Sequence, residues 1–254
     1  RNEKGKRMQA YGKSDIGLTR ALNEDSFYEG FNANHDFLGL ICDGIGGAAA
    51  GEVASGMAVD IVREEFDHAP VFHRDYEVDE WIRLTLNKAN DAIFSRSMWS
   101  RKNRGMGTTA VGVIVCSIGT YIFNVGDSRI YALYDDGLIQ MSEDHSVIQN
   151  LLNQNKITAQ QAKTHEKRNT LTNALGVWRI FKIDVNKIKS DYKMLMLCSD
   201  GLHSYVPESV IEKVICARGT LEEKVKSLID LANQAGGHDN CTIILADKGA
   251  PDAR

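Results

Sequence analysis

Residues 38–55 read LGLICDGIGGAAAGEVAS and join three different patterns. An uncharged, aliphatic run ends in Asp43, a glycine cluster follows at 44–47, and a helix-like pattern extends over about residues 48–66. The first pattern is typical of a buried strand, and the second is typical of backbone that approaches a ligand closely. A buried strand that ends in a carboxylate beside small residues indicates a polar site at the end of a sheet.

The composition is that of a globular protein. The chain has 254 residues, of which 43% are hydrophobic and 25% charged, with a formal net charge of −4. This balance argues against disorder, and the lack of a basic run argues against nucleic acid as a partner. Three prolines and no Gly/Ser- or Pro-rich tract favour one domain over residues 1–254.

The cysteines and the apolar segments favour a cytoplasmic protein. The five cysteines show no paired C-x-x-C spacing, as expected for reduced core thiols. The opening residues RNEKGKRMQA lack the apolar core of a signal peptide. Residues 105–126 carry no charge and are long enough to span a bilayer, but a break at 117–119 divides them into two β-branched runs. We therefore predict a hairpin there and no membrane span.

Strands and helices occur in blocks along the chain. Strand patterns lie near residues 8–15, 25–30, 36–43, 108–125, 129–134, 194–200 and 241–246, and helical patterns lie near 48–66, 79–98, 207–217 and 220–235. Short turns between neighbouring strands indicate antiparallel pairing, so the fold class is α+β with helices that cover antiparallel sheets. Residues 146–176 form a polar, helix-prone insertion, either a solvated excursion or a segment that selects substrates.

Four aspartates share a similar setting. Asp43, Asp127 and Asp200 follow uncharged runs and have a neighbouring glycine, and Asp239 precedes the last strand. A single aspartate of this kind usually belongs to a turn. Antiparallel strands can bring several such residues to one rim, where the carboxylates would repel one another unless cations neutralise them. The pattern therefore predicts a divalent metal site, to which the Gly44 carbonyl can contribute.

The missing residue types indicate which metal binds. No H-x-x-x-H or C-x-x-C pattern accompanies the aspartates, and oxygen ligands favour Mn²⁺ or Mg²⁺ over Zn²⁺. His238 adjoins Asp239, but the other histidines show no matching spacing, so we do not expect it to be a ligand.

Two other site types are compatible with parts of the sequence. Gly44, Gly46 and Ala49 match a dinucleotide-binding fingerprint, but no acidic residue ends a second strand at the required distance, and Asp43 would repel the phosphates. The blocks at 126–128 and 200–203 resemble the Gly-Asp-Ser and Asp-x-x-His blocks of GDS-type serine esterases, although that family places its serine near the start of the domain.

An ordered set of motifs runs along the chain. The motifs are RALNED (20–25), DGIGG (43–47) with GEVAS (51–55), MGTTAV (106–111), GDSR (126–129), SEDH (142–145), CSDGL (198–202) and GHDN (237–240). Each motif is modest alone, but over residues 9–247 their order and spacing resemble those of the metal-dependent protein phosphatases of type 2C (PPM), in particular the bacterial serine/threonine phosphatases.

The resemblance implies a four-layer αββα sandwich with a binuclear Mn²⁺ or Mg²⁺ site at one end. In it, Asp43 would bridge both ions, the Gly44 carbonyl would bind one, and Asp200 with Asp239 would bind the other. Asp127, with Asp200, would bind a third ion. Glu24 and Asp25 would hold metal-bound waters without touching the ions themselves, and Arg20 would bind the phosphate.

The implied reaction is hydrolysis of phosphoserine and phosphothreonine in proteins by a metal-bridging water. The implied partners are phosphoproteins and a kinase of eukaryotic type, with the phosphatase itself a monomer. Ile45 stands where many eukaryotic members have a histidine, so water must protonate the leaving oxygen or that step is slower. Ala48 replaces a histidine of bacterial relatives, with little expected effect on metal binding. The alternatives are a pseudophosphatase that acts as a binding module and the serine esterase.

Overall fold

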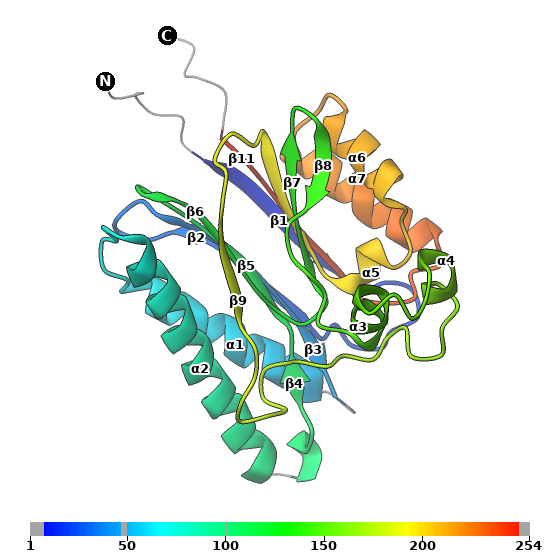
Figure 1. The fold of residues 1–254 in the computed structure, drawn as a ribbon, viewed down its shortest axis with the longest axis horizontal. Coiled ribbons are helices and arrows are strands. Elements are labelled where there is room, and N and C mark those ends of the chain that lie inside the picture. Colours follow the sequence, from blue (N-terminus) through cyan, green and yellow to red (C-terminus); the bar gives the residue numbers. More distant parts are fainter. Residues whose placement is uncertain (1–7, 47–49, 100, 249–254) are drawn as a thin grey trace.

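The computed structural model describes residues 8–46, 50–99 and 101–248, which form two antiparallel sheets with helices on both outer faces (Figure 1). The strands are β1 (Gln9–Asp15), β2 (Asp25–Phe31), β3 (Phe37–Ile45), β4 (Gly107–Thr108), β5 (Ala110–Cys116), β6 (Gly119–Val125), β7 (Arg129–Tyr134), β8 (Gly137–Gln140), β9 (Asp184–Ile188), β10 (Met194–Cys198) and β11 (Cys241–Asp247). The helices are α1 (Ala50–Asp67), α2 (Asp75–Trp99), the 3₁₀ helix η1 (Arg101–Asn103), α3 (Val147–Asn153), α4 (Ala159–Ala162), α5 (Asp200–His203), α6 (Glu208–Cys216) and α7 (Leu221–Gln234).

The two sheets have the strand orders β1-β11-β10-β7-β8 and β2-β3-β5-β6-β9, and β4 extends the second sheet beside β3. Neighbouring strands pair antiparallel throughout these sheets. The predicted hairpin is confirmed, because β5 and β6 pair from Ala110 with Val125 to Cys116 with Gly119. Within the described part of the chain, no helix combines the length and the apolar character needed to cross a bilayer.

Three apolar clusters fill the spaces between four layers of helices and sheets. One cluster joins the second sheet to α1 and α2, another joins the first sheet to α6 and α7, and the third lies between the two sheets. Figure 1 shows α1 with α2 and α6 with α7 on opposite sides of the paired sheets. The predicted αββα sandwich is therefore confirmed, and its sheet ends are held in fixed relation by cores on both sides.

The helix sequences carry the spacing that this packing requires. In α1, the buried residues Ala54, Ala58, Val62 and Phe66 recur every four positions and form one stripe, and the small alanines let the helix lie close to the sheet. Helix α7 begins with a capping box, in which the Thr220 hydroxyl accepts from the backbone of Glu223 and the Glu223 side chain accepts in return.

The structure departs from the predicted elements at the polar edges. Helix α2 begins at Asp75 rather than at 79, because acidic residues stabilise its first turn and Glu77 accepts hydrogen bonds from the backbone of His73 and Arg74. The short strands β4, β8 and β9 were not predicted. β9 pairs with β6 at a sheet edge and is only partly buried, so it lacks the apolar run that identifies a central strand.

The polar insertion at 146–176 contains α3 and α4, and neither helix has a buried residue. Ser146 caps α3, and Thr158 with Gln161 forms a capping box on α4. Figure 1 shows this segment beside α5, at the end of the sandwich where β3 ends. It therefore lies close to the predicted metal site.

Candidate active site

The predicted acidic residues meet at one end of the sandwich. Asp43 lies near the end of β3, Asp127 in the turn between β6 and β7, Asp200 at the start of α5, and Asp239 just before β11. They line one cavity of about 210 Å³, together with Arg20, Glu24, Gly44 and Ile45. The structure thus gathers side chains from four distant parts of the sequence. Ala48, for which the sequence predicts little effect, lies outside the described residues.

Burial and mutual repulsion disfavour the charged forms of the Asp43, Asp127 and Asp200 carboxyls. Burial raises the pKa of Asp43 well above its usual range, and the carboxyls of Asp25 and Asp200 raise it further. Burial also raises the pKa of Asp200 to about 6, with Asp239 adding to the rise. The pKa of Asp127 is raised well above its usual range by burial and then by Asp200. Such a site gains most from bound positive charge.

The donor set fits a hard divalent cation. Asp43, Asp127, Asp200, Asp239 and Glu24 bring carboxylate oxygens to the cavity, and Mn²⁺ and Mg²⁺ prefer such ligands. Within residues 8–46, 50–99 and 101–248, however, no three His, Cys, Asp or Glu side chains form a ready-made metal site. The side chains instead satisfy one another: Arg20 Nη2 lies 2.7 Å from Asp239 Oδ2, and the Asp43 and Asp200 carboxyls share a hydrogen bond. Cation binding would have to displace these contacts.

Asp25 lies beside Asp43, because the two residues are partners in the β2–β3 ladder. Its Oδ2 accepts hydrogen bonds from Ser199 Oγ at 2.7 Å and from Thr242 Oγ1 at 2.6 Å. Its Oδ1 is buried and has no hydrogen-bond partner among the described residues. Burial raises the pKa of Asp25 to about 7. An acceptor left unsatisfied at this depth fits the predicted role of holding a water near the ions.

Two glycines permit the close contacts that bring the acids together. A Cβ at Gly44 would lie 2.2 Å from the Gly51 carbonyl oxygen, so no larger residue fits between β3 and α1. A Cβ at Gly201 would lie 1.9 Å from the Asn240 carbonyl oxygen. Gly201 therefore lets the start of α5 touch the start of β11, which brings Asp200 beside Asp239.

Asn240 holds the loop that carries Arg20 and Glu24. Its Nδ2 donates to the carbonyls of Ile16 at 2.9 Å and Leu22 at 3.0 Å. Its Oδ1 accepts from the backbone N–H of Glu24 at 2.8 Å. The sequence reasoning gave Asn240 no role, although its place in the GHDN motif was a signal. One amide side chain therefore fixes this loop relative to Asp239.

The threonines of the MGTTAV motif hold the backbone of Asp43. Thr109 Oγ1 accepts from the Asp43 N–H at 2.9 Å, and Thr108 Oγ1 donates to the Asp43 carbonyl at 2.9 Å. Both threonines are fully buried. The sequence identified this motif by resemblance alone. The structure shows its physical role, which is to orient Asp43, the central residue of the site.

The arrangement does not support a serine esterase. Ser128 is fully buried, and its hydroxyl is hydrogen-bonded to Thr109 Oγ1 at 2.8 Å. His203 Nε2 donates to the Asp127 carbonyl at 3.0 Å, and among the described residues no hydrogen bond joins His203 to Ser128 Oγ. A buried serine whose histidine faces elsewhere is not an accessible nucleophile. His238 packs its ring against Tyr205, with centroids 5.2 Å apart, and does not line the acidic cavity.

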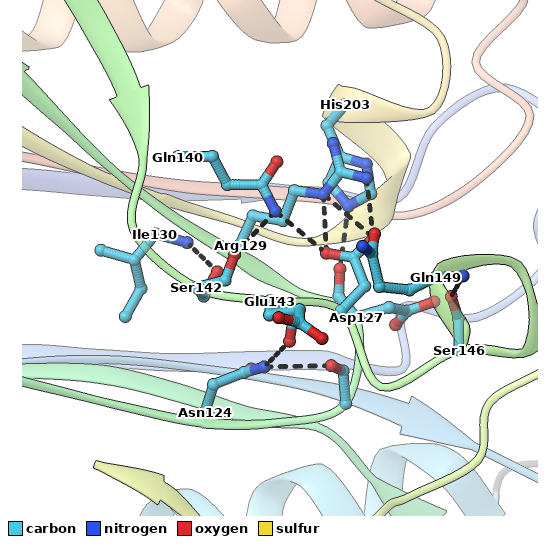
Figure 2. A network of polar contacts seen from close by, with 12 residues as sticks. Asn124, Asp127, Arg129, Ile130, Gln140, Ser142, Glu143, Ser146, Gln149 and His203 are labelled. Atoms are coloured by element: carbon cyan, nitrogen blue, oxygen red, sulfur yellow. Dashed lines mark hydrogen bonds and ion pairs between the residues drawn. The ribbon is translucent and has the colours of Figure 1, made fainter. Parts of the chain in front are cut away.

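A polar network fixes the turn that carries Asp127. Figure 2 shows Asp127 close to Arg129 and His203. Arg129 makes a bidentate ion pair with Asp144, with Nη2–Oδ2 at 2.7 Å and Nε–Oδ1 at 2.9 Å. Asn124 Nδ2 donates to the carbonyls of Glu143 and Gly126 (Figure 2). The GDSR and SEDH motifs therefore contact each other, and together they hold the turn that carries Asp127.

The chain is similar to known proteins over most of its length. The family model described as protein phosphatase 2C matches residues 18–235. The serine/threonine phosphatase stp of Listeria monocytogenes is 35% identical over 242 residues, which cover 95% of this chain and 96% of that protein. The crystal structure of the serine/threonine phosphatase Stp1 from Staphylococcus aureus superposes with a TM-score of 0.88 at 32% identity, over 94% of each chain.

A further solved structure holds metal. The catalytic domain of the serine/threonine protein phosphatase PstP, in complex with two manganese ions, matches with a TM-score of 0.80 at 30% identity. The match covers 94% of this chain and 97% of that one.

Replacing Asn240 with Asp should loosen the loop that carries Arg20. The carboxylate would face the Ile16 and Leu22 carbonyls that now accept hydrogen bonds, and we expect a loss of about 2–4 kcal/mol of unfolding free energy. Urea unfolding measures this loss. Asn155→Asp, at an exposed position, is the matched control and should stay within about 0.5 kcal/mol. Equal stability of the two variants would contradict the anchoring role.

The metal-free protein should lose thermal stability as the pH rises from about 5 to 8. The folded-state pKa values of Asp25 and Asp200 lie at about 7 and 6, above the usual value of 3.8. The folded state therefore binds more protons than the unfolded state in this pH range. The stability that this proton binding contributes is lost as the protons are released at higher pH. Unfolding followed by circular dichroism with EDTA and with Mn²⁺ tests this. We expect the gain from Mn²⁺ to be at least about 5 °C larger at pH 8 than at pH 5. A metal-free midpoint that rises over this range would refute the electrostatic account.

Proposed function

The chain belongs to the protein phosphatase 2C family, and on that premise we propose that it is a Mn²⁺- or Mg²⁺-dependent phosphatase of phosphoserine and phosphothreonine in proteins. One observation carries the proposal: four aspartates, the Gly44 backbone and Arg20 line a single small cavity. The relatives named as serine/threonine phosphatases match nearly the whole chain, which supports the choice of substrate class.

The aspartates divide into three proposed roles. Asp43, whose carboxyl meets the like charges of four other aspartates, would be shared by two cations, one of which the Gly44 carbonyl would also hold. Asp200 and Asp239 would hold the other cation. Asp127, which adjoins Asp200 in the cavity, would help to hold a third. Glu24 and Asp25 would retain waters around these ions, and the unpaired Oδ1 of Asp25 supports its part in this scheme.

When bound, such cations supply Lewis acidity and an activated water, so that attack on phosphorus needs no protein nucleophile. Arg20 would bind the phosphoryl oxygens, since its guanidinium can donate two parallel hydrogen bonds. Its side chain is 46% exposed and meets Asp239 at the cavity edge, so it can turn to a substrate. Ile45 lines the cavity and has no proton to donate, so the leaving oxygen must take its proton from water.

The remaining parts of the proposal concern the context of the enzyme. We propose that residues 1–254 act as one catalytic domain in the cytoplasm, as a monomer. Its substrates would be the phosphoproteins made by a kinase of eukaryotic type. The pseudophosphatase alternative lacks support, because no acidic residue of the proposed metal set is replaced and Arg20 is present.

Hydrolysis of p-nitrophenyl phosphate with Mn²⁺ tests the proposed reaction. We expect turnover with Mn²⁺ and its loss in EDTA. Asp43→Asn keeps the shape of the side chain but removes its charge, and should lower kcat/KM at least about a hundredfold. Asp136→Asn, at an exposed aspartate outside the cavity, is the matched control and should leave activity unchanged.

Turnover that survives EDTA would count against the proposal, as would an Asp43→Asn variant with a tenth of the wild-type activity. The esterase alternative makes the opposite forecast. It requires that Ser128→Ala abolish turnover and that EDTA have no effect.

A further inference from the structure

A second cavity, of about 520 Å³, lies beside the catalytic cavity. The two cavities share Asp127, Asn169 and Asp200 among their lining residues. One wall of the second cavity comes from the 146–176 segment, and the opposite wall comes from residues 203–207, which start at the last residue of α5. A molecule with one group in the catalytic cavity can therefore extend into the second cavity without leaving the protein surface.

Apolar side chains face each other across this cavity. Ile148 and Leu152 come from α3, one helical turn apart, and Val206 and Pro207 come from the opposite wall. Neither Ile148 nor Leu152 belongs to any of the three apolar clusters of the described chain. Both side chains are half-buried, so α3 presents apolar surface that the fold covers only in part, which is a common feature of ligand sites.

Cations line the wall formed by the 146–176 segment. Lys163 and Arg168 are both exposed and border the cavity. No carboxylate among the described residues lies within ion-pair distance of either side chain. The third cation of the cavity, Arg129, is already paired with Asp144. The charge offered to a ligand on this wall is therefore positive.

We propose that this cavity is the subsite for the polypeptide that flanks the phosphorylated residue of the substrate. It accepts one aliphatic side chain between α3 and residues 206–207, and it favours an acidic side chain beside Lys163. The inference rests on the proposed phosphatase function and deepens it. An extended chain advances about 3.5 Å per residue, so the favoured positions lie within about four residues of the phosphate.

A set of phosphothreonine peptides tests the subsite. The peptides have an alanine background, with leucine placed in turn at each position from −4 to +4, and a second set carries glutamate in the same way. Each is hydrolysed with Mn²⁺, and p-nitrophenyl phosphate, which has no flanking residues, serves as the reference substrate. We expect leucine at one position or at two adjacent positions to raise kcat/KM about tenfold over alanine.

Two substitutions locate the preference in the cavity. Leu152→Ala should abolish the leucine preference, and Lys163→Glu should turn the glutamate preference into a penalty. Lys167→Glu is the matched control for charge, because Lys167 is exposed on the same segment but does not line the cavity. All three variants should hydrolyse p-nitrophenyl phosphate within about twofold of the wild type, since none contacts the catalytic cavity.

The outcomes separate the two proposals. A flat leucine scan with normal hydrolysis of p-nitrophenyl phosphate overturns the subsite alone, and so does a preference that survives in Leu152→Ala. Equal effects of Lys163→Glu and Lys167→Glu overturn the acidic preference. Absence of Mn²⁺-dependent hydrolysis of p-nitrophenyl phosphate in the wild type overturns the phosphatase function itself.

Discussion

The main constraint on this structure is electrostatic repulsion. The fold brings several carboxyl groups together at one end of the two sheets, where they repel one another. Asp43, Asp127, Asp200 and Asp239 line one small cavity, and Asp25 lies beside Asp43 on the neighbouring strand. In this setting burial raises the pKa of Asp43, Asp127 and Asp200, because the charged form loses hydration and meets like charge. The gathered carboxyls therefore lower the stability of the folded protein, and divalent cations that bind among them would restore it.

The rest of the fold holds the acids together against this repulsion. Three apolar clusters fix the sheets and helices, so the strand ends cannot separate without disrupting a core. Local contacts then set the side chains: Gly201 allows α5 to touch β11, Thr109 and Thr108 hold Asp43, and Asn240 holds the loop of Arg20. The unfavourable electrostatic energy of the site is offset by packing elsewhere, as is common for functional sites.

The sequence predicted the strands and helices that have a regular pattern of apolar residues, and the polar residues that interrupt such a pattern. The apolar run before Asp43 and the four-residue spacing in α1 identified the central strand and its covering helix. The edge strand β9 was missed because a strand buried on one side lacks such a run. The role of Asn240 was missed because its hydrogen-bond partners are more than 200 residues away in the chain, a separation that no local pattern reveals. The second cavity likewise arises from segments that meet only in three dimensions.

Calorimetric titration of the metal-free protein with Mn²⁺ tests the central claim most directly. If the gathered carboxyls form a site for divalent cations, the wild type binds at least two ions per chain and releases protons as they bind. Asp43→Asn lacks the negative charge that two cations would share, so this variant then binds Mn²⁺ with markedly lower affinity and stoichiometry. A wild type that takes up no Mn²⁺ at neutral pH, or an Asp43→Asn variant that binds as the wild type does, would contradict the account.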